Sequence, residues 1–452
     1  MRLFQHQLEA IDSWKAANYR GIISMATGTG KTYTAIGCAD LIFKQLDRAI
    51  CFITVPYKHL IGQWRESITK YDLQHDLIIE CHSENSNWPR QLVKVIPKIV
   101  IGQFSKVIVI STHSSLVSEK MTRIITNIPQ SIKKILIADE VHGMGSEKRR
   151  NNLPHSFDYI LGLSATPKRM YDEIGNRFLK SFFGDIIYEF PLCKAVYELN
   201  VVTNKTYLTP YYYYPIKISL NAEESERYFF LTRKIVNLIK KKGIDLSTAS
   251  LEDLETANIE DLERLLFKRS EIIKTASEKI EKLPEILRKI QDRQGDLKDT
   301  ILFTHEKIID KVIRVVESTH ATYRRFTQEL SLKEREQILD AFKKGHIDVL
   351  IAIKILDEGV DIPSAKNAVI ISSTTNPREY IQRLGRVLRP SENKPLAYIY
   401  DFVVLDSLKM FSNSPELHTL EEKFARSELL RVRVIAECSL NGINAVTDVF
   451  RW

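Results

Sequence analysis

A glycine-rich loop near the N-terminus has the residue types that bind phosphate. Met25-Ala26-Thr27-Gly28-Thr29-Gly30-Lys31-Thr32 follows a short β-branched run and precedes a stretch with helical spacing. Glycines let backbone amides approach an anion closely, and the N-terminus of a helix carries partial positive charge. The lysine of such a loop reaches the outer phosphates of a nucleoside triphosphate, and the next hydroxyl binds Mg²⁺. We therefore expect ATP and Mg²⁺ here, with Thr32 as a metal ligand and contacts from Thr27, Gly28, Thr29, Gly30, Lys31 and Thr32.

Two adjacent carboxylates could supply the metal ligand and the general base that hydrolysis of a bound nucleotide requires. Asp139 and Glu140 follow the apolar run 134–138 and precede His142. A carboxylate at the end of a buried strand can hold the Mg²⁺ of a nucleotide, and a second one can activate the attacking water as a general base. We expect Asp139 to bind the metal, Glu140 to act as the base, and His142 to relay the state of the nucleotide. Together with Lys31, these residues predict ATP hydrolysis.

Parallel sheets must position these residues, because apolar runs alternate with helical patterns along most of the chain. Near-continuous apolar runs are typical of strands buried on both faces, and their alternation with helices indicates doubly wound α/β domains. Residues 221–294 instead carry mixed charges at helical spacing, which predicts a helical insertion. The apolar runs are 21–24, 49–54, 106–110, 134–138 and 159–163, and then 299–303, 349–353, 368–371 and 397–402.

The length of 452 residues fits about three folded units. Tyr211-Tyr212-Tyr213-Tyr214, between Pro210 and Pro215, falls at the first composition shift. Such a run either stacks on nucleic-acid bases or packs as an edge strand, and we favour the strand. The predicted segments are a first α/β domain over 1–210, a linker and helical insertion over 211–297, a second α/β domain over 298–405, and a helical tail over 406–452.

The composition excludes several classes of protein. With 44% hydrophobic and 27% charged residues, the chain is typical of globular proteins rather than disordered ones. No apolar run approaches the ~20 residues of a membrane span, and the first residues resemble an amphipathic helix rather than a signal peptide. No pair of the five cysteines has the spacing of metal ligands. We expect no membrane partner and a cytoplasmic location, in a bacterium or a phage-infected cell.

The net charge of +8 is mild for this length, and it permits a polyanionic partner without requiring one. Residues 1–210 hold 26 basic and 19 acidic side chains, a difference of +7. Residues 211–294 hold 16 and 15, and residues 295–452 hold 23 and 23. The excess therefore lies almost wholly in the first domain, where either a solvated surface or a nucleic-acid contact explains it.

Further short motifs follow in a fixed order, and the whole set resembles a superfamily 2 helicase. His6-Gln7 resembles the motif of that family that reads adenine, and Gln382-Arg383-Leu384-Gly385-Arg386-Val387-Leu388-Arg389 matches motif VI throughout. The resemblance covers residues 2 to 405 and implies two tandem RecA-like domains with ATP bound between them. The other matching segments are Val55-Pro56 with Gln63-Trp64 (motif Ia), Ser111-Thr112-His113 (Ib), Ser164-Ala165-Thr166 (III), Phe303-Thr304-His305 (IV) and residues 356–363 (V).

Motif VI supplies a positive charge that the first domain lacks. Arg386 and Arg389 lie three residues apart on one face of a predicted helix, and they can stabilise phosphoryl transfer as arginine fingers. A surface helix of ion pairs would show the same spacing, but the neighbouring Gln382 favours a catalytic role for all three residues. The resemblance further implies that Gly359 and Asp361 of motif V contact the nucleotide.

The resemblance also implies contacts with a DNA strand, mainly through its phosphates and therefore with little sequence preference. Motif V has Ile353 where the family commonly has Thr, so we expect no hydroxyl contact there. Arg169-Met170-Tyr171-Asp172 stands where XPB-like helicases often have Arg-Glu-Asp, so the role of that tripeptide is not transferred. The residues expected to contact DNA are Pro56, Lys58, Thr112, His113, Thr304 and His305.

The Asp-Glu-Val-His box, the Gln-Trp pair and motif V are closest to the XPB-like helicases, which the phage branch-migration helicases of the UvsW type also resemble. The first motif begins almost at Met1 and only residues 406–452 follow the second domain, which suggests a compact motor. We expect a monomeric ATP-dependent DNA helicase or translocase that acts on single-stranded, forked or branched DNA. Branch migration, recombination or repair would be its task, and the resemblance implies 3′→5′ movement.

Three other functions fit parts of the pattern. A motor that moves along duplex DNA without separating strands, for a partner nuclease, recombination factor or restriction complex, would carry the same motifs. An RNA helicase would also carry them, because the choice of nucleic acid depends on contacts to the 2′-hydroxyl. A passive nucleic-acid-binding scaffold would show no DNA-stimulated ATP hydrolysis, and the intact Lys31, Asp139 and Glu140 disfavour it.

Overall fold

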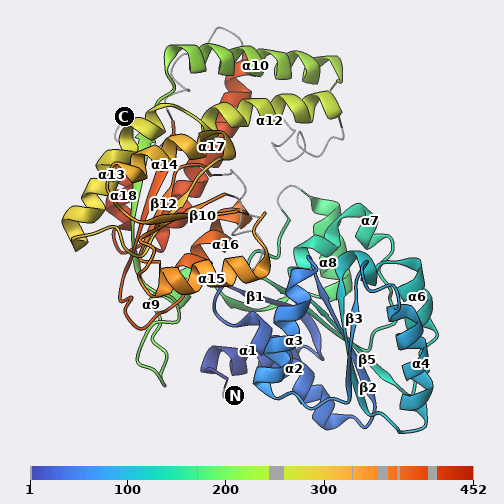
Figure 1. The fold of residues 1–452 in the computed structure, drawn as a ribbon. Coiled ribbons are helices and arrows are strands. Elements are labelled where there is room, and N and C mark those ends of the chain that lie inside the picture. The colour runs from blue at the N-terminus through green and yellow to red at the C-terminus, as the bar shows by residue number, and fades with distance from the viewer. Residues whose placement is uncertain are drawn as a thin grey trace. The chain divides into compact units, whose positions relative to one another are not determined.

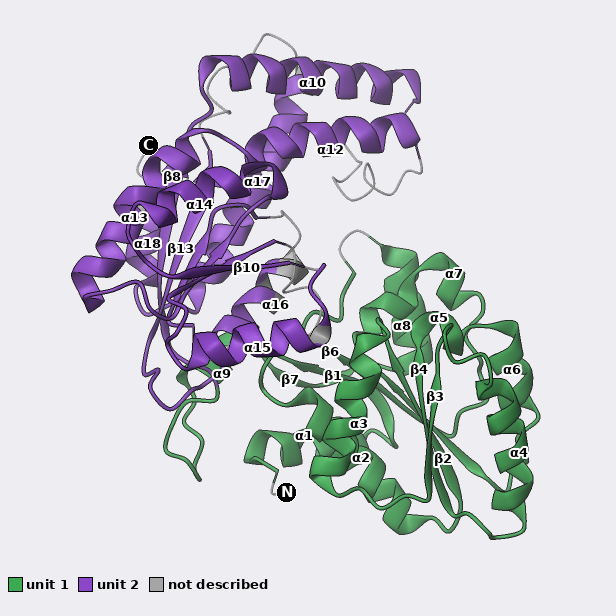
Figure 2. Cartoon of the chain, viewed as in Figure 1, with its two compact units in different colours: residues 1–207 green, residues 208–452 purple. Residues whose placement is uncertain are grey.

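The computed structural model describes residues 3–169, 172–243, 259–327, 329–353, 365–373, 377–405 and 415–450. The chain divides into two compact units, Met1–Tyr207 and Leu208–Trp452 (Figure 2). Each unit is built on a parallel sheet of its own. Within the described ranges, no helix is both long enough and apolar enough to cross a membrane.

The first unit contains a seven-stranded sheet in the order β3-β4-β2-β5-β6-β1-β7. Five strands form where the apolar runs predicted them, and Ile53 of β2 pairs with Ile110 of β4 and Ile137 of β5. The sequence did not predict β3 and β7, because they are the two edge strands and their half-buried side chains do not form a continuous apolar run. The strands are β1 (Arg20–Met25), β2 (Ala49–Val55), β3 (Leu77–Cys81), β4 (Lys106–Thr112), β5 (Lys133–Ala138), β6 (Tyr159–Ser164) and β7 (Ile186–Phe190).

Helices cover both faces of this sheet, with α1 (Gln5–Ala16), α2 (Lys31–Gln45) and α3 (His59–Tyr71) on one face and α4 (Trp88–Val100) and α6 (Glu119–Thr126) on the other (Figure 1). In α4 the buried residues Trp88, Leu92, Val95 and Ile99 recur at helical spacing and pack on the sheet. The remaining helices of this unit are α5 (His113–Leu116), η1 (Val141–Gly145), α7 (Glu147–Arg150), α8 (Glu173–Phe183) and α9 (Leu192–Tyr197).

The second unit contains a six-stranded sheet in the order β10-β11-β9-β12-β13-β8. Helix α13 (Glu278–Gln294) packs with α14 (Ile309–Glu317) into the core of this sheet through residues such as Leu287, Ile290 and Val312. The strands are β8 (Tyr211–Ile218), β9 (Thr300–Phe303), β10 (Tyr323–Phe326), β11 (Val349–Ala352), β12 (Asn367–Ile370) and β13 (Ala397–Val404). The other elements of the sheet region are η2 (Glu306–Ile308), α15 (Leu332–Lys343), α16 (Pro377–Val387) and α18 (Gly442–Phe450).

The tyrosine run is an edge strand, as favoured from the sequence. Tyr211 and Tyr213 of β8 are fully buried, and Tyr212 and Tyr214 stack on Tyr398 and Tyr400 of the neighbouring β13. The segment 211–297 therefore differs from the expected linker and helical insertion. Its first strand and its last helix, α13, belong to the second sheet domain, because pairing with β13 and burial of the apolar face of α13 stabilise both there.

Two helices of the expected insertion stand apart from the sheet. Helices α10 (Ala222–Lys241) and α12 (Glu260–Lys274) lie side by side (Figure 1) and pack with α17 (Pro415–Glu437) through Ile235, Leu262 and Leu420. Arg269 and Glu421 form a buried ion pair of 2.6 Å in this small bundle. The helical tail predicted from the sequence thus supplies the third helix of the bundle.

Candidate nucleotide site in the first unit

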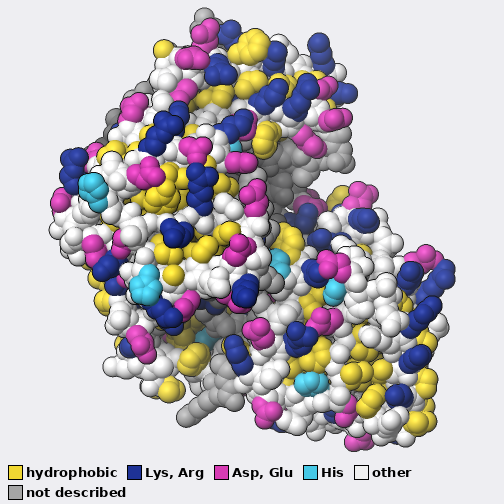
Figure 3. Space-filling view, viewed as in Figure 1, with side chains coloured by type: hydrophobic (Ala, Val, Ile, Leu, Met, Phe, Trp, Pro, Cys, Tyr) yellow, Lys and Arg dark blue, Asp and Glu magenta, His cyan; other side chains and the backbone are white. Residues whose placement is uncertain are grey.

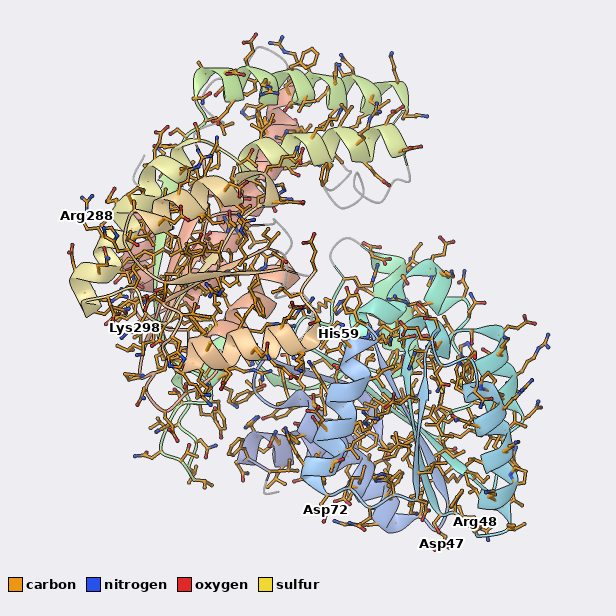
Figure 4. The ribbon with its side chains drawn as sticks, viewed as in Figure 1. Asp47, Arg48, His59, Asp72, Arg288 and Lys298 are labelled. Atoms are coloured by element: carbon orange, nitrogen blue, oxygen red, sulfur yellow. The ribbon has the colours of Figure 1, made fainter. Side chains whose placement is uncertain are left out.

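The predicted catalytic residues of the first unit lie at the carboxyl ends of its strands. The glycine-rich loop follows β1, Asp139 follows β5, and Ser164 ends β6. Figure 4 shows His59 at this edge, where α3 begins, and Asp47, Arg48 and Asp72 at the opposite edge. Ligands of parallel α/β sheets bind at the carboxyl edge, where loops leave the strands.

The glycine-rich loop has the geometry of a phosphate cradle. Gly28 and Gly30 have φ values of 90° and 91°, which residues with a side chain rarely adopt. Gly30 is the N-cap of α2, and within the described part of the chain no side chain caps that end, so its amides face outward from the helix. The hydroxyl of Thr27 is buried and has no hydrogen-bond partner among the residues that the structure describes. Uncapped amides and a buried hydroxyl are the groups that a phosphate anion would satisfy.

Lys31 occupies the centre of this arrangement. Its ammonium donates a hydrogen bond of 3.1 Å to the carbonyl of Met25 at the start of the loop, and its charge lowers the pKa of Asp139. Thr32 is the next residue in the first turn of α2. Among the described residues, no three His, Cys, Asp or Glu side chains are grouped as a metal site. Thr32 and Asp139 nevertheless fit Mg²⁺, which commonly binds few protein ligands together with phosphate oxygens and water.

His6 and Gln7 contact the loop itself in this structure. The Nε2 atom of His6 donates to the carbonyl of Thr29 at 2.9 Å, and the Nε2 atom of Gln7 donates to the carbonyl of Gly30 at 3.1 Å. The Oε1 atom of Gln7 accepts from the amide of Phe4, so both ends of its amide are in use. The two residues are 1% and 2% exposed. The contact of these residues with adenine stays a prediction, and the structure adds that the amide of Gln7 bonds the phosphate loop.

Asp139 is a buried carboxylate held by an indole. The Nε1 atom of Trp64, in α3, donates to Oδ2 of Asp139 at 3.0 Å. Burial and the charge of Glu140 raise the pKa of Asp139, Lys31 and the Trp64 N–H lower it, and the net pKa is about 6. Binding of Mg²⁺ would favour the ionised form of such a carboxylate. The structure thus orients Asp139 from a residue 75 positions away.

Glu140 is linked to the following motifs by a chain of hydrogen bonds. The hydroxyl of Ser164 donates to Oε2 of Glu140 at 3.2 Å and lies 3.1 Å from Nδ1 of His142. Because the single hydroxyl hydrogen goes to Glu140, His142 donates through Nδ1, which fixes its tautomer. Glu140 also has a φ of 45°, a strained conformation that is often found at functional sites. This arrangement agrees with a relay through His142.

Arg169 links the carboxylate motif (residues 139–142) to the start of α8 by two hydrogen bonds. Its guanidinium donates to the carbonyl of His142 at 2.9 Å and to the carboxylate of Asp172 at 2.5 Å. A Cβ atom at Gly145 would lie 2.6 Å from the Arg169 side chain, so only glycine permits this approach. Arg169 and Asp172 thus form a local clamp on the carboxylate motif, although the sequence lacks the family tripeptide.

The predicted DNA contacts of the first unit lie in different surroundings. Lys58 is exposed and paired with Glu84, Pro56 is half-buried, and the Thr112 hydroxyl caps α5 by accepting from Ser115 at 3.2 Å. His113 is fully buried, and its Nδ1 lies 2.9 Å from the hydroxyl of Thr54. Burial holds the pKa of His113 well below its usual value. The expected DNA contact of His113 is therefore corrected, because its neutral ring fills the interior.

The second unit contains the predicted site residues of motifs IV to VI, and the structure describes some of them. Thr304 is buried at the end of β9, His305 is half-buried and accepts from the amide of Lys307, and Gln382 lies in α16. Arg386, also in α16, is buried, and Arg389 is half-buried two residues after that helix ends. The predicted residues Gly359 and Asp361 of motif V lie outside the described residues.

Sequence reasoning did not assign Trp64, Ser164 or Arg169 to the site. Trp64 and Ser164 lie in segments that resemble helicase motifs, and this signal could have marked them. Their partners are 75 and 24 residues away, so no local spacing could identify the contacts. For Arg169, the only signal in the sequence was that residues 169–172 differ from the Arg-Glu-Asp pattern of the family.

Comparison with known proteins agrees with this geometry. Residues 1–169 match the family described as type III restriction enzyme, res subunit, and residues 278–391 match the helicase conserved C-terminal domain. The chain is 30% identical over 408 residues to the DNA 3'-5' translocase XPB2 of Sulfurisphaera tokodaii, which covers 88% of this chain and 80% of that protein. The chain belongs to the XPB-like superfamily 2 helicases. It is therefore an ATP-dependent enzyme of the helicase class.

Two solved structures share the fold of this XPB-like helicase. The ATP-dependent type ISP restriction-modification enzyme LlaBIII bound to DNA has a TM-score of 0.62 at 17% identity, over 96% of this chain and 30% of that chain. The Hef helicase domain of Pyrococcus furiosus has a TM-score of 0.53 at 17% identity, over 89% of this chain and 97% of that one. These likenesses confirm the expected tandem RecA-like architecture.

Proposed function

We propose that this XPB-like helicase is an ATP-driven motor that moves 3′→5′ on DNA and remodels forked or branched DNA. The observation that carries the proposal is the connected set of contacts in the first unit. The charge of Lys31 acts on Asp139, Trp64 donates a hydrogen bond to Asp139, and Ser164 donates one to Glu140, so a change at the nucleotide can reach three successive motifs. The relative from Sulfurisphaera tokodaii, named as a DNA 3'-5' translocase, supports the choice of DNA and of direction.

In the proposed reaction, Lys31 and the loop amides bind the β- and γ-phosphates of ATP. Glu140 accepts the proton of the attacking water while the new oxygen–phosphorus bond forms and the bond between the γ-phosphorus and the bridging oxygen breaks. Thr32 and Asp139 would hold Mg²⁺, which supplies charge stabilisation of the phosphoryl group. Motif VI is proposed to act on the same phosphoryl group, with Gln382 as a hydrogen-bonding partner and Arg386 and Arg389 as positively charged partners.

The proposed DNA contacts are sequence-tolerant and reversible. Basic and acidic side chains are interspersed over the visible face of the molecule (Figure 3), and the net charge is only +8. A motor must release DNA at every step, which a strongly basic surface would slow. Lys58, Pro56 and Thr112 from the first unit, and Thr304 and His305 from the second, are the proposed contacts.

A pair of variants tests the proposal directly. Lys31→Ala and Glu140→Gln are expected to abolish ATP hydrolysis and the unwinding of a forked duplex. Lys44→Ala is the matched control, because this exposed lysine of the same helix pairs with Asp40 at 2.7 Å, outside the phosphate loop. Unwinding by either site variant at the native rate would show that the assignment is wrong. ATPase stimulation should be compared among single-stranded DNA, duplex, fork, four-way junction and RNA, and stimulation by RNA alone would favour an RNA helicase.

A second function is favoured by one observation. The match of residues 1–169 to a restriction-enzyme subunit fits a motor that moves along duplex DNA for a partner nuclease without separating strands. Displacement of a triplex-forming strand from duplex DNA, without unwinding of a fork, would support this alternative. Unwinding of a branched substrate by the purified chain alone would contradict it. Light scattering on the same sample tests the proposed monomer.

A further inference from the structure

The segment that joins the two units is anchored on both sides. Tyr207 ends the first unit and Leu208 begins the second. The Tyr207 ring packs edge-on against His6 at 4.4 Å and against Phe190 at 5.2 Å between centroids. Residues 207–209 are 7%, 0% and 3% exposed, whereas segments that join domains are usually exposed and mobile. This burial indicates that the linker (residues 207–209) is a structural element.

The first anchor leads to the phosphate loop. His6 stacks on Phe190 at 4.4 Å and donates to the carbonyl of Thr29, within the loop, at 2.9 Å. Burial lowers the pKa of His6, so the ring is neutral and its Nε2–H is available for this bond. A displacement of the loop carbonyl therefore moves a ring that Tyr207 contacts directly.

The second anchor leads to the motif VI helix. The amide of Thr209 donates to the carbonyl of Leu388 at 2.7 Å, and its hydroxyl donates to the carbonyl of Arg389 at 3.4 Å. These carbonyls follow α16, which carries Arg386. Lys394 contacts the same turn, because its ammonium donates to the carbonyl of Arg389. The linker thus helps to fix the end of the helix whose arginines are proposed to act on ATP.

We propose that Tyr207 and Thr209 are positioning residues, and that the linker transmits the state of the phosphate loop to the arginines of motif VI through the covalent chain. Consecutive Cα atoms are 3.8 Å apart, so three residues span at most about 8 Å and cannot stretch. A short segment fixed at both ends passes on a displacement that a longer one would absorb. This inference rests on the proposed ATP hydrolysis, to which it adds the coupling of the two units.

Lengthening the linker tests the inference while both anchors remain. Insertion of two glycines between Leu208 and Thr209 is expected to leave the KM for ATP and the basal hydrolysis rate within about twofold. Stimulation of hydrolysis by DNA should fall about tenfold, within the usual range for coupling between sites. Tyr207→Ala should have the same effect and Tyr207→Phe should not, because phenylalanine keeps the ring.

The control is the same insertion between Val202 and Thr203, where Val201 and Val202 are 89% and 67% exposed and the linker is unchanged. This variant should retain native stimulation, and thermal melting of each variant checks folding. Native stimulation in the lengthened linker, or equal loss in the control, would overturn the inference.

A second measurement separates this inference from the proposed function. Hydrogen exchange of the amides of Thr209 and of the turn around Leu388 is followed on addition of ADP. In the native chain the nucleotide should change their protection, and the inserted glycines should remove that change. If ADP changes the protection of these amides equally in the native chain and in the variant with two inserted glycines, the proposed role of the linker is wrong, even if no hydrolysis occurs. Absence of ATP hydrolysis in the native chain refutes only the proposed motor function.

Discussion

Replacement of Trp64 by phenylalanine probes how the metal-binding carboxylate is held. The change keeps a large aromatic ring at a site that is 2% exposed, but it removes the 3.0 Å hydrogen bond to Asp139. A hydrogen bond to a charged group contributes about 1.5–3 kcal/mol, and 1.4 kcal/mol is about tenfold in an equilibrium constant. Removal of residues that orient metal ligands commonly lowers metal affinity by about 10–100-fold. Both arguments predict that Mg²⁺ affinity falls at least about tenfold.

The assay is ATP hydrolysis titrated with Mg²⁺ at saturating ATP. In Trp64→Phe the half-saturating Mg²⁺ concentration should rise about tenfold, and excess Mg²⁺ should restore most of the rate. Trp14→Phe is the matched control, because Trp14 is fully buried and donates a bond of the same 3.0 Å length to the carbonyl of Ile160. The control should lose stability without a change in Mg²⁺ dependence. An unchanged Mg²⁺ titration in Trp64→Phe would refute the orienting role.

Three further predictions concern the clamp and the buried charges. Arg169→Lys should lower kcat about tenfold in ATPase assays, because lysine cannot keep the geometry of both guanidinium bonds. Asp401→Asn should destabilise the second unit by about 3 kcal/mol in urea denaturation, because it breaks a buried 2.8 Å ion pair with Arg431. Burial lowers the pKa of Lys279 from 10.5 to about 7. Between these two pH values the Lys279 amine is protonated in the unfolded chain and neutral in the folded one, so the free energy of unfolding rises with pH. Lys279→Met should therefore stabilise most at or below pH 7, by at most about 5 kcal/mol, with the gain vanishing toward pH 10.5 and absent in the exposed control Lys289→Met.

Much of the candidate site could be predicted because its chemistry is encoded locally. The phosphate loop needs glycines at positive φ directly before a helix, and the structure has both at Gly28 and Gly30. The carboxylate pair needs a buried strand directly before it, and β5 ends at Ala138. Such features depend on residues within one loop and its flanking elements, so spacing along the chain is sufficient evidence.

The sequence could not predict the surroundings of a side chain where a distant partner decides them. His113 carries the residue type of a DNA contact, but packing against β2 and Thr54 enclosed it. Gln7 matches the adenine motif, and the sequence did not show that its amide also bonds the carbonyl of Gly30 in the phosphate loop. A side chain's surroundings depend on which segments fold against it, and the residues beside it in the sequence do not specify those segments.

The sequence by itself determined the two α/β domains and the order of the motifs, and it predicted the residues of the first unit that are proposed to hydrolyse ATP. Only the tertiary structure decided that the strand favoured for the tyrosine run, residues 211–218, belongs to the second sheet, because its partner β13 lies almost 190 residues later. It also decided that Trp64 orients Asp139 and that Thr209 is bonded to the end of motif VI. The physical reason is the same in each case, since strand pairing and side-chain hydrogen bonds join groups whose separation in sequence has no bearing on their distance in space.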